Sequence, residues 1–287
     1  MILLMKAAEL FKKYMKCSDK SSETIKGYLT ELNQFNTFLT AKYNGPVYID
    51  EVTVQDMEDY IHMLREKGNA PSSRSRSIYI LRAYTNFCQK RGYVSQNIGI
   101  MLEPVPVPEK ERVFLTAEEM DILLSSVKAP IAKLILFTLF YTGMRISECL
   151  NLQLKDVDLK NRIISVKNTK SKKDRQIPIH KDLNPILEEY LTHWRIDGTS
   201  PFFFVSRNKS RVSPDYINRI LYETTHRLHW DKKVTCHIIR HSFASNLVTK
   251  NVNIVNIQKL LGHNDLSTTS IYTHSNIDEL ANAINTM

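Results

Sequence analysis

The stretch Thr235-Cys-His-Ile-Ile-Arg-His-Ser-Phe243 opens a segment that continues through Leu260-Leu-Gly-His263 and ends at Ile271-Tyr-Thr-His274. Its apolar positions recur at helical spacing, and a glycine marks the end of a second helix. His237 and Arg240 lie three residues apart, so they share one face of the first helix. Taken together with residues 142–148, this stretch predicts a phosphate-binding active site with a tyrosine beside it.

A second charged stretch, Thr142-Gly-Met-Arg-Ile-Ser-Glu148, lies about a hundred residues upstream. The run 131–141 before it is apolar on all sides, which predicts a buried central helix that breaks at Thr142-Gly143. Arg145 follows the break, with Glu148 one turn further on. Such a pair also forms weak ion pairs on the surfaces of unrelated proteins. Whether Arg145 and Glu148 belong to a functional site therefore depends on the other residues around them.

The composition favours a polyanionic partner. The 287 residues include 39 Lys and Arg against 30 Asp and Glu, giving a formal net charge of +9. This charge favours nucleic acid first and an anionic membrane surface second. The sequence has neither an apolar run of about 18 residues nor a secretory signal, so we expect no membrane partner and a cytoplasmic location.

The cysteines and histidines favour neither a disulfide framework nor a metal site. The cysteines stand far apart, which predicts reduced thiols; they are Cys17, Cys88, Cys149 and Cys236. His237 and His241 have the spacing of a zinc-binding helix, but no glutamate lies between them and no cysteine pair is near. We therefore expect no metal and no cofactor.

The N-terminal third predicts a small bundle of helices. Helical spacing marks 22–39 and, less clearly, 5–16, and a capping box at Thr53 starts a helix that closes at Gly68. Another helix begins after Pro71-Ser72-Ser73 and stops before Gly92. This last helix carries three arginines suited to DNA phosphates, although a solvated basic face explains them equally well; they are Arg74, Arg76 and Arg82.

A proline-rich stretch separates this bundle from the rest. Glu103 to Arg112 contains three alternating prolines, which exclude a helix and favour an extended connector. We therefore expect a helical domain over 1–104, a linker over 105–112 and a second domain over 113–287.

The second domain is predicted to be mainly helical with one small β-hairpin. A capping box at Thr116 starts its first helix. Residues 163–166 and 176–179 form the hairpin, with 167–175 at its tip, and these are the clear strands of the chain. Further helices are expected near 181–194, 214–228, 236–249 and 253–261. Residues 277–284 form a short amphipathic tail.

The order of these features resembles the tyrosine recombinase (phage integrase) family. The order is Arg145, a lysine on a hairpin tip, His237-x-x-Arg240, Gly262-His263 and Tyr272. Each feature is weak alone, but five in this order and spacing are specific. The resemblance covers the chain from about residue 113, and the preceding bundle resembles the core-binding domain of the family.

The resemblance implies a role for each matching residue. Arg145 and Arg240 would grip the scissile phosphate, with His237 accepting a proton and His263 bonding a non-bridging oxygen. Tyr272 matches the nucleophile. Glu148 stands where the family has a supporting acidic residue.

The general acid is matched less securely. Lys170 is our assignment, because Thr169-Lys170-Ser-Lys-Lys-Asp-Arg-Gln-Ile-Pro-Ile179 is similar to the hairpin turn of the family. Lys167, Lys172 and Lys173 compete with it, and the last two are also candidates for DNA contact.

The resemblance further implies a site-specific recombinase that acts through a 3'-phosphotyrosyl intermediate and a Holliday junction. Two domains would clamp duplex DNA, and four protomers would assemble through the C-terminal tail. The competing hypotheses are a catalytically idle DNA-binding architectural protein and a strand relaxer similar to type IB topoisomerases. The sequence shows no extra N-terminal arm-binding domain, which favours a Xer-type enzyme or, by a slight preference, a recombinase or resolvase of a mobile element.

Overall fold

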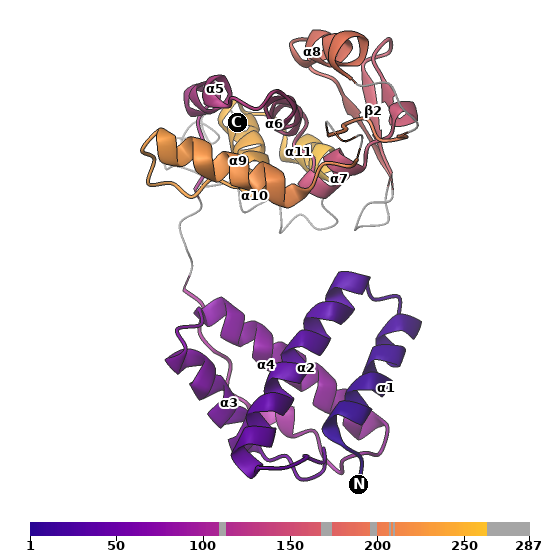
Figure 1. Cartoon of the computed structure of the whole chain (residues 1–287), viewed down its shortest axis with the longest axis vertical. Helices are drawn as coiled ribbons and strands as arrows, with labels where there is room; N and C mark the ends of the chain where they lie inside the picture. The colour runs from indigo at the N-terminus through magenta and orange to yellow at the C-terminus, as the bar shows by residue number, and fades with distance from the viewer. Residues whose placement is uncertain (109–112, 168–173, 196–199, 207, 209, 263–287) are drawn as a thin grey trace, which may run out of the picture. The chain divides into compact units, whose positions relative to one another are not determined.

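The computed structural model describes residues 1–108, 113–167, 174–195, 200–206, 208 and 210–262. The chain divides into two compact units, Met1–Glu111 and Arg112–Met287. Each unit buries its own hydrophobic cluster, and the two are traced in different colours in Figure 1.

The first unit is a helical bundle, as the sequence predicts. Thr53 and Asp56 form the expected capping box, since the Asp56 N–H donates to Thr53 Oγ1 at 3.2 Å and the Thr53 N–H donates to Asp56 Oδ2 at 2.9 Å. Phe35, Tyr60 and Tyr84 are fully buried at its centre. Its elements are α1 (Leu4–Cys17), α2 (Ser22–Tyr43), α3 (Val54–Glu66), α4 (Pro71–Lys90) and the 3-10 turn η1 (Ile98–Met101).

The second unit is mainly helical. Its central helix is α6, whose residues Ile135, Leu136 and Leu139 are fully buried, as expected for an apolar run. Helix α6 packs against α10. Its α-helices are α5 (Ala117–Ser126), α6 (Pro130–Thr142), α7 (Ile146–Asn151), α8 (Leu183–Glu189), α9 (Pro214–Arg227), α10 (Cys236–Thr249) and α11 (Ile254–Leu261), and it also contains the 3-10 helix η2 (Leu154–Asp156) and the π-helix η3 (Tyr190–Trp194).

The sheet of this unit has three antiparallel strands in the order β1-β2-β3. The predicted hairpin is confirmed as β2 (Ile163–Val166) and β3 (Arg175–Pro178), with Ile164 opposite Ile177. Two details differ from the prediction. The strand β1 (Val157–Asp158) is added, and it is too short to show an alternating pattern. The other difference is Arg175, which begins β3 instead of belonging to the tip.

Candidate active site

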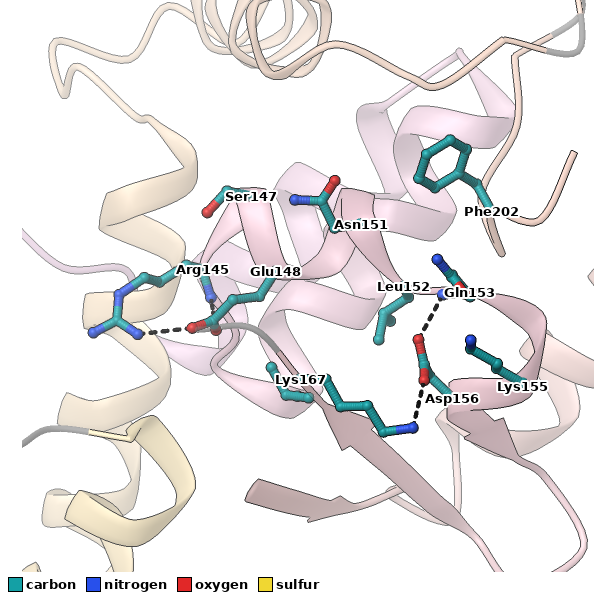
Figure 2. A pocket seen from close by; sticks show the side chains of 11 residues that line it. Arg145, Ser147, Glu148, Asn151, Leu152, Gln153, Lys155, Asp156, Lys167 and Phe202 are labelled. Carbon is teal, nitrogen blue, oxygen red and sulfur yellow. Dashed lines mark hydrogen bonds and ion pairs between the residues drawn. The ribbon is translucent and has the colours of Figure 1, made fainter. Parts of the chain in front are cut away.

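Glu148 lies at the centre of the site. It is on α7, and its side chain is only 6% exposed. One carboxylate oxygen accepts the backbone N–H of Arg145 at 2.9 Å, and the other accepts Arg145 Nη1 at 2.8 Å. Glu148 therefore caps its own helix and holds the side chain of Arg145, as Figure 2 shows.

Two more arginines reach the same carboxylate from other elements. Arg175 of β3 donates from Nη2 to Oε2 at 2.8 Å and from Nη1 to Oε1 at 3.3 Å. Arg240 of α10 brings Nη1 to 4.0 Å from Oε2. The fold thus gathers three guanidinium groups from residues separated by up to 95 positions (240 − 145) around one buried acid.

This arrangement keeps Glu148 ionised. Burial by itself raises the pKa of Glu148, but hydrogen bonds from Arg175 and Arg145 outweigh burial and lower the pKa to about 2. The carboxylate is therefore a fixed negative charge at neutral pH. Such a charge offsets part of the cost of holding three cations close together.

Arg240 is the most deeply buried of the three. Its side chain is 4% exposed, and it donates to the carbonyl of Gly143 at 2.6 Å and to that of Leu261 at 2.7 Å. Gly143 ends α6 with φ of +62°, and a side chain there would collide with the ring of Phe243. Glycine at this position therefore allows α6, α10 and Arg240 to meet.

The last backbone carbonyls of α11 accept hydrogen bonds from two of these arginines. Leu260 accepts Arg175 Nε at 2.8 Å, and the next carbonyl, that of Leu261, accepts Arg240. Cations at a helix C-terminus bond its unpaired carbonyls and face the negative end of its dipole. Gly262 then ends the helix with φ of +65°. Gly262 itself lies beside Arg175, since a Cβ on it would be 3.0 Å from Arg175 Nη1.

His237 lies on α10, one turn before Arg240, and is exposed. Its Nε2 is 3.0 Å from Nε2 of His241, with the two rings nearly perpendicular at 88°. One imidazole donates this hydrogen bond and the other accepts it, so the contact couples the tautomers of the two rings. In the described ranges, no three His, Cys, Asp or Glu side chains gather as a metal site would require.

A cavity of about 430 Å³ opens beside Arg145. Figure 2 shows Arg145 with Glu148 on one side of it and Lys167 with Asp156 on the other. Lys167 Nζ is 3.2 Å from Asp156 Oδ1. The Arg145 side chain is 31% exposed and borders this cavity. The lining of the cavity thus combines the cations Arg145, Lys155 and Lys167 with the acids Glu148 and Asp156.

The structure brings together Arg145, Glu148 and Arg240, as the sequence predicts, and places His237 on the helix that carries Arg240. Several predicted positions lie outside the described residues, namely Lys170, Lys172, Lys173, His263, Tyr272 and the tail 277–284.

The three arginines of α4 have different surroundings. Arg76 is exposed, and Arg74 donates to the carbonyl of Asn69 at 3.3 Å. Arg82 donates to the carbonyl of Leu102 at 2.6 Å, which ties it to the bundle itself. Arg76 is thus the most accessible of the predicted phosphate contacts.

Sequence reasoning missed Arg175. The alternation of side chains along a strand could have revealed it. Residues 175 and 177 lie on the same face of the strand, and Ile177 is buried. An arginine on the inner face of a strand needs a buried acid as its partner. Glu148 is that partner.

Comparison with known proteins identifies the family. Residues 113–279 match the phage integrase family, and residues 8–92 match the N-terminal SAM-like domain of phage integrases. The chain belongs to the phage integrase family. This integrase-family chain is also 32% identical to a tyrosine recombinase of Thermosipho africanus over 94% of its own length and 95% of that relative. It is a site-specific DNA recombinase, as the resemblance implied.

Solved structures of integrases share the fold. The Tn1549 transposon integrase in complex with a circular intermediate DNA matches with a TM-score of 0.81 at 19% identity, over 99% of each chain. A lambda integrase tetramer bound to a Holliday junction matches with a TM-score of 0.78 at 16% identity, over 92% of this chain and 78% of that one. The described parts of this integrase-family chain include no helix long and apolar enough to cross a membrane.

Proposed function

We propose that this recombinase binds a duplex recombination site and cuts each strand by forming a 3'-phosphotyrosyl bond with Tyr272. The convergence of Arg145 and Arg240 on Glu148 carries this proposal. Two planar guanidinium groups can bind the non-bridging oxygens of one phosphate and stabilise the charge that develops when it is attacked.

The chemistry conserves the energy of the DNA backbone. The hydroxyl oxygen of Tyr272 attacks phosphorus, the bond from phosphorus to the 5' oxygen breaks, and a phosphotyrosyl ester forms. His237 accepts the phenolic proton, Lys170 gives a proton to the departing 5' oxygen, and His263 bonds a non-bridging oxygen. In the reverse direction, the 5' hydroxyl of a partner strand attacks the ester and releases Tyr272, which produces the Holliday junction.

The test is trapping of the covalent complex. In a duplex that carries a selected target site and a nick just beyond the cut, cleavage releases the short fragment that bears the free 5' hydroxyl, so that religation is prevented. The wild-type protein should become linked to the 3' phosphate, and Tyr272→Phe should abolish the link. Tyr222→Phe is the matched control, because Tyr222 is 65% exposed on α9 and has no assigned role. A covalent complex that survives Tyr272→Phe would refute the assignment.

We propose that four protomers assemble on the junction and that residues 277–287 of one protomer dock on the next. The lambda integrase tetramer on a Holliday junction supports the assembly, and a cyclic head-to-tail contact would close it. A chain ending at residue 276 should bind a single site with unchanged affinity but fail to pair two sites in a gel-shift assay. Normal recombination by the truncated chain would rule out the docking role.

We propose a mobile element or the resolution of a replicon as the setting. Selecting bound duplexes from a random pool and locating the cut sequence in the source genome tests this. A site that flanks the recombinase gene supports a mobile element. One chromosomal site far from that gene supports resolution of chromosome dimers.

A further inference from the structure

We infer that Arg175 is a positioning residue of the recombination reaction, one that fixes Glu148 and the end of α11 in a single arrangement. Through these two partners it orients Arg145 and Arg240 and fixes the C-terminal end of α11. The inference rests on the proposed roles of Arg145 and Arg240.

The guanidinium group of Arg175 divides its donors between the two partners. Nε donates to the carbonyl of Leu260 at 2.8 Å, while Nη2 and Nη1 donate to the two oxygens of Glu148 at 2.8 and 3.3 Å. Its planar fork fixes both bonds at once, whereas a lysine ammonium is a single point charge. One side chain of β3 therefore joins α7 to α11.

Arg240 makes a parallel set of contacts from the other side. It donates to the carbonyl of Leu261, directly after the one that Arg175 takes, and it also approaches Glu148. Gly262 packs tightly here, since a Cβ on it would lie 3.0 Å from Arg175 Nη1. The end of α11 is thus held between two arginines that share one acid.

Burial separates the role of Arg175 from that of Arg145. The Arg175 side chain is 9% exposed, whereas Arg145 is 31% exposed and borders the cavity. Arg175 therefore acts through its partners and not by touching DNA. The charged and titratable groups facing Glu148 are Arg145, Arg175 and Arg240, together with the buried thiol of the adjacent Cys149.

The experiment measures single-turnover cleavage of the nicked duplex between pH 5 and 8, with DNA affinity measured alongside. Arg175→Gln should bind within about twofold of wild type, because a buried group adds little to phosphate contact. Its cleavage at neutral pH should fall about a hundredfold, the effect of a small misplacement of reacting groups. Arg162→Gln is the matched control, an exposed arginine beside β2, and should cleave like wild type.

The pH dependence distinguishes positioning from loss of structure. Without Arg175, burial raises the pKa of Glu148, so the ratio of wild-type to variant cleavage should grow as the pH falls. A purely structural loss lowers cleavage by the same factor at every pH. Arg175→Lys keeps the positive charge, so its ratio of wild-type to variant cleavage should grow less steeply as the pH falls. This variant replaces Arg175→Gln in the experiment if Arg175→Gln does not fold.

A double variant completes the test. Because one of the two partners of Arg175 is Glu148, the loss of cleavage in the double variant Arg175→Gln/Glu148→Gln should be smaller than the product of the two single losses; the remaining loss reports the bond to the carbonyl of Leu260. Three results would each overturn the inference. The first is a double variant whose loss of cleavage equals the product of the two single losses. The others are a ratio of wild-type to variant cleavage that does not change with pH, and cleavage by Arg175→Gln within threefold of wild type. Failure of the wild-type protein to form any covalent complex would instead refute the proposed function.

Discussion

At the scale of the residue, one carboxylate decides whether the arginines of the site can be held together. Arg240 and Arg175 are nearly buried, and burying a cation without an opposite charge is costly. Glu148 supplies that charge. Its effect on stability should therefore be large and should depend on pH.

Glu148→Gln should destabilise the second unit by about 3 kcal/mol at pH 7, because it leaves the arginines without their counter-charge. The folded-state pKa of about 2 lies below the ordinary value of 4.5. The ionised group therefore stabilises fully above pH 4.5, and its contribution disappears as the pH falls towards 2. Urea unfolding followed by tryptophan fluorescence should show that the difference in unfolding free energy between wild type and Glu148→Gln falls to about half its pH 7 value at pH 3.

The control for this measurement is Glu189→Gln, at an exposed position on α8. It should stay within about 0.5 kcal/mol of wild type at both pH values. A loss of stability in Glu148→Gln that is equal at pH 7 and pH 3 would mean that its carboxylate charge is not what stabilises the site.

Individual residues also show what the sequence can and cannot predict. The meeting of Arg145, Glu148 and Arg240 could be expected from the resemblance to the integrase family, because these residues follow the order of the family along the chain. Arg175 could not be expected in this way, because its partner lies 27 residues away on another element. A contact of that kind depends on how the sheet packs against α7, which local pattern does not contain.

At the scale of the element, the junction between α6 and α7 is set by one glycine. The sequence predicts the break at Thr142-Gly143, and the structure confirms it, with Gly143 in the left-handed conformation. The approach of Phe243 from α10 could not be predicted, because it belongs to the packing of two helices about a hundred residues apart.

Gly143→Ala should therefore lower the free energy of unfolding by more than the strain of its left-handed backbone conformation alone. Gly68 is a suitable comparison, since its φ is +78° and a Cβ on it would meet nothing within 4 Å. Gly68→Ala should cost about 1–2 kcal/mol from conformation. Gly143→Ala should add roughly 1–3 kcal/mol of overpacking against Phe243.

Chemical unfolding of the two variants measures this difference, with tryptophan fluorescence for Gly143→Ala and circular dichroism for Gly68→Ala. Gly143→Ala should also slow cleavage, because the carbonyl of Gly143 accepts a hydrogen bond from Arg240. Equal losses in the two variants would show that the ring of Phe243 moves aside at little cost.

At the scale of the whole molecule, the hydrophobic cluster of the first unit shares no residue with the clusters of the second unit. The composition of 103–112 predicts a connector between them, because three alternating prolines exclude a helix. Each unit therefore has what a domain needs to fold by itself. Synthesising the units separately makes this testable.

Residues 1–104 and 113–287 should each fold as separate chains. Both tryptophans of the protein, Trp194 and Trp230, belong to the second unit, so fluorescence reports on that unit alone. The denaturant midpoint of the fragment 113–287 should match the fluorescence midpoint of the full chain. A missing or strongly shifted transition would mean that the second unit depends on the first.

If the fragments fold, DNA binding should show what the connector contributes. Each fragment should bind a selected site weakly, while the joined chain gains from the high effective concentration of its second unit. The fragment 113–287 contains every residue proposed to act on the phosphate, so at high concentration it should still form the covalent complex. A folded fragment that binds but never cleaves would show that the first unit helps to assemble the active site, and not only to hold the DNA.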